Sequence, residues 1–377
     1  MRLADITTLR VGGDAHRVLE STTQDELLAA VRDTWSSGED WLLLGGGSNV
    51  VIADEGFDGT VIRVRTRGIE RVASEAVAVR PSAYLGDRAV RLRIGAGEPW
   101  DAVVDHAVQQ GWAGIEALSG IPGSSGAAPI QNIGAYGQEL GSSLVAIEFL
   151  DYLTGELERI PAPGLGLGYR TSLLKQGRQG LVASIELELF EGTGGGPALS
   201  APIAYDQLAG ALGVRIGDRV PLDELRATVL ELRASKGMLL DPNDRDSFSA
   251  GSFFTNPIVG ENFARGLPRD APRWPTAPEE QDVVVPLGAA PAVPQVAGEY
   301  QVKLSAAWLI EKTGISRGFA FPGSHAAVSS RHTLALVNTG GATAEEIVEL
   351  ARFIQTRVFA EFGVRLQPEP VLVGVSL

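Results

Sequence analysis

The spacing of apolar residues along the chain predicts helices in several places. Near each end a Thr-x-x-Glu motif, at Thr23 and at Thr343, precedes apolar residues that recur every three or four positions. Such a motif caps a helix N-terminus, and the recurrence puts the apolar side chains on one face. We therefore expect helices from Thr23 to about Gly38 and from Thr343 to about Gly363. Shorter patterns predict helices after Pro99-Trp100-Asp101, at residues 222–235 and at residues 305–313.

Short apolar runs bounded by turn residues predict strands between these helices. One run, residues 41–44, is interrupted by Gly45-Gly46-Gly47-Ser48-Asn49 and resumes at residues 50–53. A glycine turn between two apolar strands allows bare main chain to approach another group closely. Further strands are expected at residues 89–94, 144–152, 181–190, 333–338, 364–366 and 371–375.

Two segments fit neither pattern. Residues 120–137 are too rich in glycine for a regular element and too apolar for a solvated linker, so we expect an ordered loop with a ligand against it. Residues 268–294 contain seven prolines and little periodicity, which indicates a long loop. The remaining mixture of helices and strands, without an internal repeat, predicts an α+β or mixed α/β protein of about three units.

Composition narrows the class of protein. A chain of 377 residues with 44% hydrophobic and 21% charged residues suits a soluble protein of two or three domains. The formal net charge of −14 disfavours nucleic acid as a partner. No signal-like start and no apolar stretch of about 18 residues is present, so we expect no membrane partner and a cytoplasmic location. With no cysteine and four scattered histidines, no metal site is expected.

The glycine motifs of the two common nucleotide-binding folds are missing. The sequence holds no G-x-G-x-x-G run and no Gly-Lys dipeptide, which excludes a dinucleotide-binding Rossmann turn and a P-loop. Two separate glycine-rich segments, 45–49 and 120–137, can each point main-chain N–H groups at phosphate oxygens. Side-chain donors within them are Ser48, Asn49, Ser124 and Ser125. Together the segments predict a pyrophosphate site.

Seven motifs in order along the chain are similar to those of one family. They are residues 8–13 (Thr-Leu-Arg-Val-Gly-Gly), 44–49, 95–98, 121–123 followed by 129–137, 168–172 (Gly-Tyr-Arg-Thr-Ser), 250–257 (Ala-Gly-Ser-Phe-Phe-Thr-Asn-Pro) and 366–369 (Leu-Gln-Pro-Glu). The chain resembles the UDP-N-acetylenolpyruvoylglucosamine reductase (MurB) family.

The resemblance implies an α+β architecture: a two-part FAD-binding fold of the MurB/vanillyl-alcohol-oxidase type plus a separate α+β substrate-binding domain. The expected divisions are residues 1–71 with 364–377 for the first FAD-binding subdomain, 72–237 for the second, and 238–363 for the substrate-binding domain. The implied reaction is the NADPH-dependent, FAD-mediated reduction of UDP-N-acetylglucosamine enolpyruvate to UDP-N-acetylmuramate in peptidoglycan precursor synthesis. FAD is expected to bind non-covalently and NADPH to act as co-substrate, with no obligate protein partner.

Three residues match the family's catalytic positions, and their chemistry suits the reaction. Hydride addition to a vinyl group beside a carboxylate leaves negative charge on the neighbouring carbon, and a fixed guanidinium stabilises such charge. The resemblance assigns this role to Arg170, and the role of proton donor to the carbanion to Ser252. It assigns to Glu369, in its protonated form, a hydrogen bond to the intermediate, which requires a raised pKa.

The resemblance also implies binding residues. The cofactor contacts are Gly45, Gly46, Gly47, Ser48, Asn49, Gly123, Ser124, Ser125, Gln131, Asn132, Gly134, Ala135 and Tyr136. The contacts to the substrate or the nicotinamide are Tyr205, Arg233, Lys236, Asn256, Lys303 and His332. The chain departs from the family pattern in its longer segments 268–300 and 192–202, and Trp274 stands where a tyrosine lid residue is expected.

Two other functions compete with this interpretation. One is an FAD oxidase of related fold that acts on another alcohol or sugar; its covalent-flavin members often use a histidine or cysteine near the glycine loops, and neither segment here has one. The other is a flavin-free UDP-sugar-binding protein, which would leave Ser252 and Glu369 without a role.

Overall fold

The computed structural model describes residues 1–73, 88–192, 196–276 and 300–377. Its first unit is a parallel sheet of β1 (Ala15–Ser21), β4 (Phe57–Val64) and β2 (Trp41–Leu44), in the order β1-β4-β2. Helix α1 (Gln24–Ser37) packs on this sheet through the fully buried Leu27 and Val31. The predicted capping box of Thr23 and Glu26 is present, and Gly38 ends the helix in the left-handed conformation.

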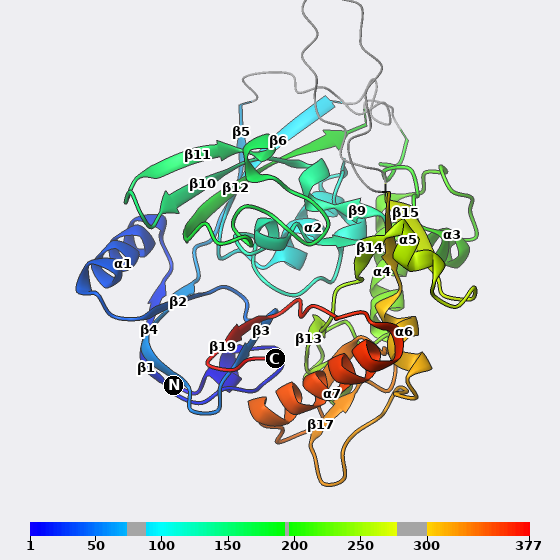
Figure 1. Cartoon of the computed structure of the whole chain (residues 1–377). Helices are drawn as coiled ribbons and strands as arrows, with labels where there is room; N and C mark the ends of the chain where they lie inside the picture. The colour runs from blue at the N-terminus through cyan, green and yellow to red at the C-terminus, as the bar shows by residue number, and fades with distance from the viewer. Residues whose placement is uncertain (74–87, 193–195, 277–299) are drawn as a thin grey trace, which may run out of the picture.

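A late strand of the chain joins this first unit. Strand β19 (Val371–Val373) pairs in parallel with β3 (Val50–Ile52), which directly follows the glycine turn 45–49. Figure 1 shows the red β19 lying against the blue β3. The segment that carries Glu369 is thereby placed next to the glycine turn.

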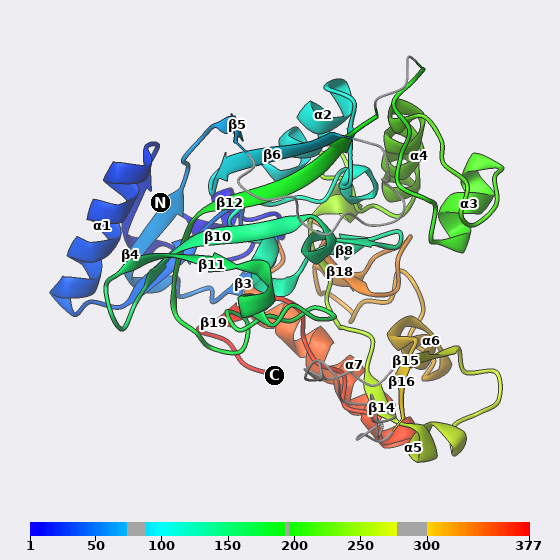
Figure 2. The ribbon, with the colours of Figure 1, turned by 90° about the horizontal axis from the view of Figure 1, so that it is seen from above.

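The second unit is a mainly antiparallel sheet in the order β11-β10-β12-β6-β5, with β7 paired to β12. Helices α2 and α4 lie beside it, with α3 against α4 at the far side from α1 (Figure 2). Buried Trp100 of α2 and Phe149 of β10 are among the largest side chains of its core. The bounds are β5 (Ile69–Val72), β6 (Arg88–Gly95), α2 (Trp100–Gln109), β7 (Trp112–Ala113), β8 (Gly134–Ala135), β9 (Gln138–Glu139), β10 (Leu144–Asp151), β11 (Leu157–Pro161), β12 (Gly180–Glu191), α3 (Asp206–Leu212) and α4 (Leu222–Ser235).

The third unit contains two small antiparallel sheets, β13-β18-β17 and β14-β16-β15. Helix α7 packs on the first of them, and the capping box of Thr343 and Glu346 opens this helix as predicted. The bounds are β13 (Ser249–Ser252), β14 (Ile258–Gly260), α5 (Glu261–Arg265), β15 (Arg273–Thr276), β16 (Gln301–Leu304), α6 (Ala306–Lys312), β17 (Ala326–Val328), β18 (Ala335–Asn338) and α7 (Ala344–Phe362).

Two predictions of local structure were wrong. Residues 364–366 do not form a strand: Val364 and Leu366 are buried, but the carbonyl oxygen of Leu366 accepts a hydrogen bond from Gln355 Nε2 of α7 (2.7 Å) rather than from a strand. In the proline-rich segment, residues 273–276 are not loop but strand β15, because they pair with β16 at an edge where proline is tolerated. The rest of that segment, 277–299, lies outside the described residues.

Candidate active site

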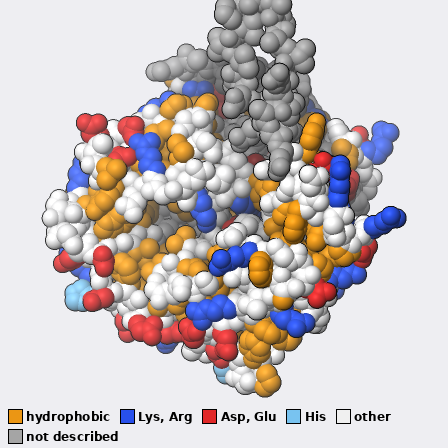
Figure 3. Space-filling model, viewed as in Figure 1, with side chains coloured by type: hydrophobic (Ala, Val, Ile, Leu, Met, Phe, Trp, Pro, Cys, Tyr) orange, Lys and Arg blue, Asp and Glu red, His pale blue; other side chains and the backbone are white. Residues whose placement is uncertain are grey.

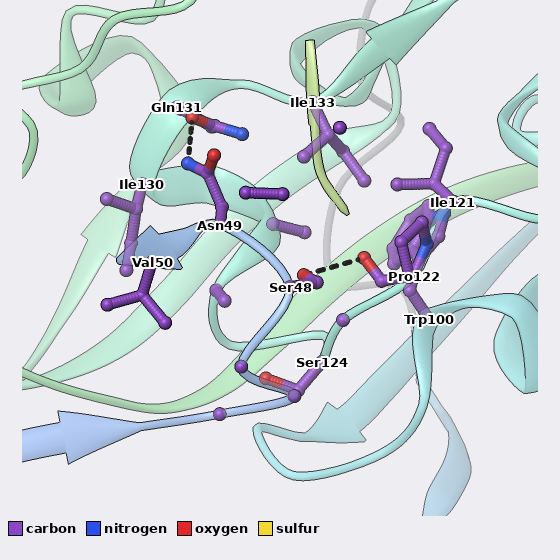
Figure 4. Close-up of a pocket in the computed structure, with 18 of the residues that line it drawn as sticks. Ser48, Asn49, Val50, Trp100, Ile121, Pro122, Ser124, Ile130, Gln131 and Ile133 are labelled. Atoms are coloured by element: carbon purple, nitrogen blue, oxygen red, sulfur yellow. Dashed lines mark hydrogen bonds between the residues drawn. The ribbon is translucent and has the colours of Figure 1, made fainter. Parts of the chain in front are cut away.

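The two glycine-rich segments meet in space, as their shared role predicted. The turn 45–49 runs directly against residues 121–124, and Ser48 Oγ donates a hydrogen bond to the carbonyl oxygen of Pro122 (3.0 Å; Figure 4). A Cβ on Gly45 would lie 2.3 Å from Ser124 Oγ, and one on Gly46 would lie 2.6 Å from the Cα of Gly123. Only glycine permits this approach, so the turn is built for close main-chain contact.

A pocket opens along this junction, and its chemistry fits FAD. One wall is the bare main chain of residues 45–49 and 121–124, which suits phosphate oxygens. The apolar side chains of Val50, Ile130 and Ile133 lie nearby and suit a flat ring system (Figure 4). Asn49 Nδ2 donates to Gln131 Oε1 (2.8 Å), which links the two segments a second time. In Figure 3 Lys and Arg side chains border the hollow in the middle of the face shown.

Arg170 enters this pocket with its guanidinium held by the second glycine segment. Its Nη2 donates to the carbonyl oxygen of Gly134 (2.6 Å) and its Nη1 to that of Asn132 (3.4 Å). The main chain at Arg170 has φ +54°, a left-handed conformation that is uncommon outside glycine and is concentrated at functional positions. The guanidinium is therefore fixed before any ligand arrives.

Glu369 lies opposite Arg170. Its Oε1 is 3.3 Å from Arg170 Nε, and the side chain is only 13% exposed. Burial raises the pKa of Glu369, while the positive charges of Arg170 and Lys175 act in the opposite direction. A carboxyl group with a raised pKa can keep its proton and donate a hydrogen bond.

Ser252 is brought to the same pocket by the pairing of its neighbours. The main-chain N–H of Glu369 donates to the carbonyl oxygen of Phe253 (2.9 Å), so the Ser252 and Glu369 segments run side by side. Gly251, at φ +75°, lies inside β13 at the register shift between Ser249 and Ser252. The Oγ of Ser252 is 3.5 Å from Nε2 of His332.

His332 is uncharged at neutral pH. Burial, and then the nearby cations Lys236 and Arg233, lower the pKa of His332 from 6.5 to about 4. A neutral imidazole beside Ser252 can donate or accept one hydrogen bond according to its tautomer.

Arg233, Lys236, Tyr136 and Tyr205 form a second group at the pocket edge. Burial lowers the pKa of Arg233 and of Lys236. Arg233 Nη2 donates to the carbonyl oxygen of Met238 (2.9 Å), but its buried Nε has no hydrogen-bond partner among the described residues. Lys236 Nζ is 5.4 Å from the ring centre of Tyr136, which meets Tyr205 edge-on at 5.9 Å. The group presents positive charge and aromatic surface together.

Lys303 of β16 and Trp274 of β15 form a third group. It contacts Tyr169, the residue that precedes Arg170 in the sequence. Lys303 Nζ is 4.9 Å from the ring centre of Tyr169 and 6.0 Å from that of Trp274. Asn256 Oδ1 accepts the main-chain N–H of Ala306 (3.0 Å) and so fixes the start of α6.

The structure separates the predicted site residues into two sets. Those that line the pocket are Gly45, Gly46, Gly47, Ser48, Asn49, Gly123, Ser124, Gln131, Gly134, Arg170, Arg233, Ser252 and Glu369. Those that lie outside its lining are Ser125, Asn132, Ala135, Tyr136, Tyr205, Lys236, Asn256, Lys303 and His332.

The side chains of Ser125 and Asn132 are engaged within the protein. Ser125 Oγ donates to the carbonyl oxygen of Glu98 (3.1 Å), and Asn132 Nδ2 donates to Glu139 Oε2 (3.0 Å). Several lining residues were not predicted, among them Trp100, Lys175 and Met238. Of these, Lys175 lies five positions after Arg170 in the same loop, and this proximity in the sequence could have suggested it as a site residue.

Among the described residues, no group of three or more His, Asp or Glu side chains is placed to hold a metal ion. None of the described helices is both long enough and apolar enough to cross a membrane.

Comparison with known proteins identifies the class of the site. Residues 15–160 match the FAD binding domain family. With the pocket between the two glycine segments, this match defines the chain as an FAD-dependent oxidoreductase. Residues 241–373 match the C-terminal domain of UDP-N-acetylenolpyruvoylglucosamine reductase. The chain belongs to the UDP-N-acetylenolpyruvoylglucosamine reductase (MurB) family.

Similarity to individual members extends over the whole chain. It is 59% identical over 383 residues to the UDP-N-acetylenolpyruvoylglucosamine reductase of Leifsonia xyli subsp. xyli, covering all of this chain and 98% of that one. It is 45% identical over 377 residues to the protein of the same name from Streptomyces coelicolor, covering all of this chain and 90% of the other. The crystal structure of MurB from Thermus caldophilus superimposes with a TM-score of 0.58 at 26% identity, over 99% of this chain and 97% of that one. The predicted fold class is thus confirmed.

Proposed function

We propose that Arg170, Ser252 and Glu369 carry out the family reaction in this chain: reduction of the enolpyruvyl group of UDP-N-acetylglucosamine enolpyruvate to give UDP-N-acetylmuramate. The observation that carries the proposal is the convergence of these three side chains, from three distant segments, on the pocket beside the glycine turn 45–49. FAD bound there would supply the redox chemistry, namely transfer of hydride from NADPH to the enolpyruvyl group.

Arg170 stabilises the charge that develops on the substrate. Addition of hydride moves negative charge onto the carbon beside the carboxylate and into the carboxylate itself. The Arg170 guanidinium, already fixed by the carbonyl oxygens of Gly134 and Asn132, can pair with that group without reorganising. A single prepositioned donor of this kind contributes about 2.7–4 kcal/mol to lowering the barrier.

Ser252 supplies the proton that completes the reduction. Its hydroxyl hydrogen goes to the carbon beside the carboxylate, and the oxygen is left with negative charge. The Nε2–H tautomer of the neutral His332, 3.5 Å away, can donate to that oxygen, and the cations Arg233 and Lys236 lie nearby. These neighbours lower the cost of ionising a group that is a weak acid in water.

Glu369 acts in its protonated form. Burial raises its pKa, so that the carboxyl group can donate a hydrogen bond to the substrate carboxylate as charge accumulates there. Arg170 and Glu369, side by side, then hold the same group, one by charge and one by a hydrogen bond.

The binding roles and domain divisions follow the same proposal. Main chain at 45–49 and 121–124 would hold the FAD pyrophosphate, and the Arg233–Lys236 and Lys303–Trp274 groups would hold the UDP-sugar. The divisions at residues 71, 237 and 363 are supported by the pairing of β19 with β3, which returns the segment 364–377 to the first unit. We also propose that the enzyme works in the cytoplasm on these small molecules without an obligate protein partner.

Anaerobic stopped-flow absorbance tests the proposal. The yellow protein is reduced with NADPH and then mixed with UDP-N-acetylglucosamine enolpyruvate. We expect rapid return of the oxidised flavin spectrum, with one UDP-N-acetylmuramate formed per flavin. A purified protein without flavin absorbance would favour the binding-protein alternative. A reduced flavin that returns only with oxygen would favour an oxidase.

A further inference from the structure

The main chain of Glu369 is held from three separate segments. Lys175 Nζ donates to the carbonyl oxygen of Glu369 (2.7 Å), and Asn49 Nδ2 reaches the same oxygen (3.3 Å). The N–H of Glu369 donates to the carbonyl oxygen of Phe253 (2.9 Å). These hydrogen bonds fix the main chain of Glu369 to the arginine loop, the glycine turn and the Ser252 segment. The position from which its carboxyl group extends is thereby fixed.

The hydrogen bond from Lys175 is the shortest of the three and the only one made by a charged group. Its ammonium lines the pocket, and no carboxylate lies within ion-pair distance of it in the described part of the chain. Burial lowers the pKa of Lys175, and the charge of Glu369 partly offsets this effect. A half-buried cation whose hydrogen-bond partner is a neutral carbonyl is poorly compensated, so packing alone does not explain it.

The loop that carries Lys175 is itself fixed to the cofactor segment. The main-chain N–H of Lys175 donates to Ser172 Oγ (3.2 Å), and that hydroxyl donates to the carbonyl oxygen of Ile130 (2.6 Å). Ser172 is fully buried. These hydrogen bonds fix the main chain of Lys175, and with it the position from which the side chain reaches the Glu369 carbonyl oxygen.

We propose that Lys175 is a positioning residue for the reduction: its ammonium holds the peptide carbonyl of Glu369 so that the carboxyl group stays beside Arg170 and faces the substrate. The inference rests on the proposed function and deepens it by adding a residue that acts through Glu369. Lys175 itself transfers no proton in this role.

The same geometry gives Lys175 an electrostatic effect that a purely structural contact lacks. The ionisable groups that face the Glu369 carboxyl are Arg170, Lys175 and Tyr169. Lys175 lowers the pKa of Glu369, so removal of its charge raises that pKa further. Because the protonated acid is the active form, the decline of rate at high pH then begins at a higher pH.

The test compares K175M and K175R with the surface control K312M in the FAD-loaded protein. Lys312 is half exposed and pairs with Asp270, outside the pocket lining. In K175M we expect reoxidation of the reduced flavin by the enolpyruvyl substrate to slow roughly tenfold to a hundredfold. Reduction by NADPH, FAD content and Tm should stay close to those of K312M. The alkaline decline of the reoxidation rate should move to higher pH in K175M and remain in place in K175R.

An unchanged reoxidation rate and pH profile in folded K175M would overturn the inference. So would a slower rate with an unmoved alkaline decline, because that pattern belongs to a structural contact. If K175M does not fold, K175Q is judged by the same two criteria. Failure of the wild-type protein to turn over the substrate is a different result, which removes the proposed function itself.

Discussion

The carboxyl oxygen of Glu369 lies 3.3 Å from Nε of Arg170, so the two side chains are in direct contact in the lining of the pocket beside the glycine turn. An arginine next to a carboxyl group ordinarily favours the ionised acid, yet burial dominates here and raises the pKa of Glu369. The pair can then act on one substrate carboxylate as a cation and a neutral donor.

Replacement of Arg170 by methionine tests the contribution of its positive charge, because methionine is also a long, unbranched side chain but is uncharged. In R170M we expect the reoxidation rate with the enolpyruvyl substrate to fall roughly 10²–10³-fold, because a fixed donor to the developing charge is lost. FAD content, read from the flavin spectrum, should change little, since the glycine wall remains. A loss below tenfold in folded, flavin-loaded R170M would remove Arg170 from this role.

Replacement of Ser252 separates the two half-reactions. S252A should accept electrons from NADPH at nearly the wild-type rate, because no proton is delivered to carbon in that step. Its reoxidation by the enolpyruvyl substrate should slow severely, by roughly 10²-fold or more. Stopped-flow absorbance follows both steps in one preparation, and normal reoxidation would show that another group is the acid.

We expect ionisation of Glu369 to make the folded protein less stable as the pH rises. Its folded pKa is raised above the unfolded value, so the folded state binds the proton more tightly and stability falls as pH rises through that window. E369Q removes this loss, so its Tm should exceed that of the wild type at pH 8. The two Tm values should converge in acid, below the ordinary carboxyl pKa of about 4.3. Equal Tm values at both pH extremes would contradict the raised pKa.

The glycine junction can be tested with a matched pair of alanine substitutions. In G46A the new Cβ would lie 2.6 Å from the Cα of Gly123, where main chain cannot yield cheaply. We expect loss of bound FAD and a lower Tm. In G210A, on α3, the Cβ meets nothing within 4 Å, and the change should be neutral or slightly stabilising. Retention of full flavin content by G46A would show that the segments can separate without cost to the site.

The sequence allowed much of this arrangement to be predicted, for identifiable physical reasons. Helix caps are local signals, so the starts of α1 and α7 at Thr23 and Thr343 could be read directly. The close main-chain approach at the glycine turn 45–49 could also be predicted, because a run of glycines between two apolar strands permits such an approach.

The features that could not be predicted depend on contacts between distant residues. Apolar alternation at 364–366 looks like a strand, but only the fold brings Gln355 to the Leu366 carbonyl. The strand at 273–276 depends on β16, which lies beyond the proline-rich segment. Likewise, nothing in the local pattern shows that Asn132 is engaged by Glu139, or that Lys175 reaches Glu369.

The pairing of β19 with β3 also orders events during synthesis. The ribosome makes the glycine turn early, whereas Glu369 and the strand that holds it beside that turn are added after both glycine segments and Ser252. A nascent chain that has folded its earlier units still lacks Glu369 and Val371, which line the pocket. Translation that stalls before Glu369 would therefore leave a protein with both glycine segments but without the carboxyl group proposed to assist the reduction.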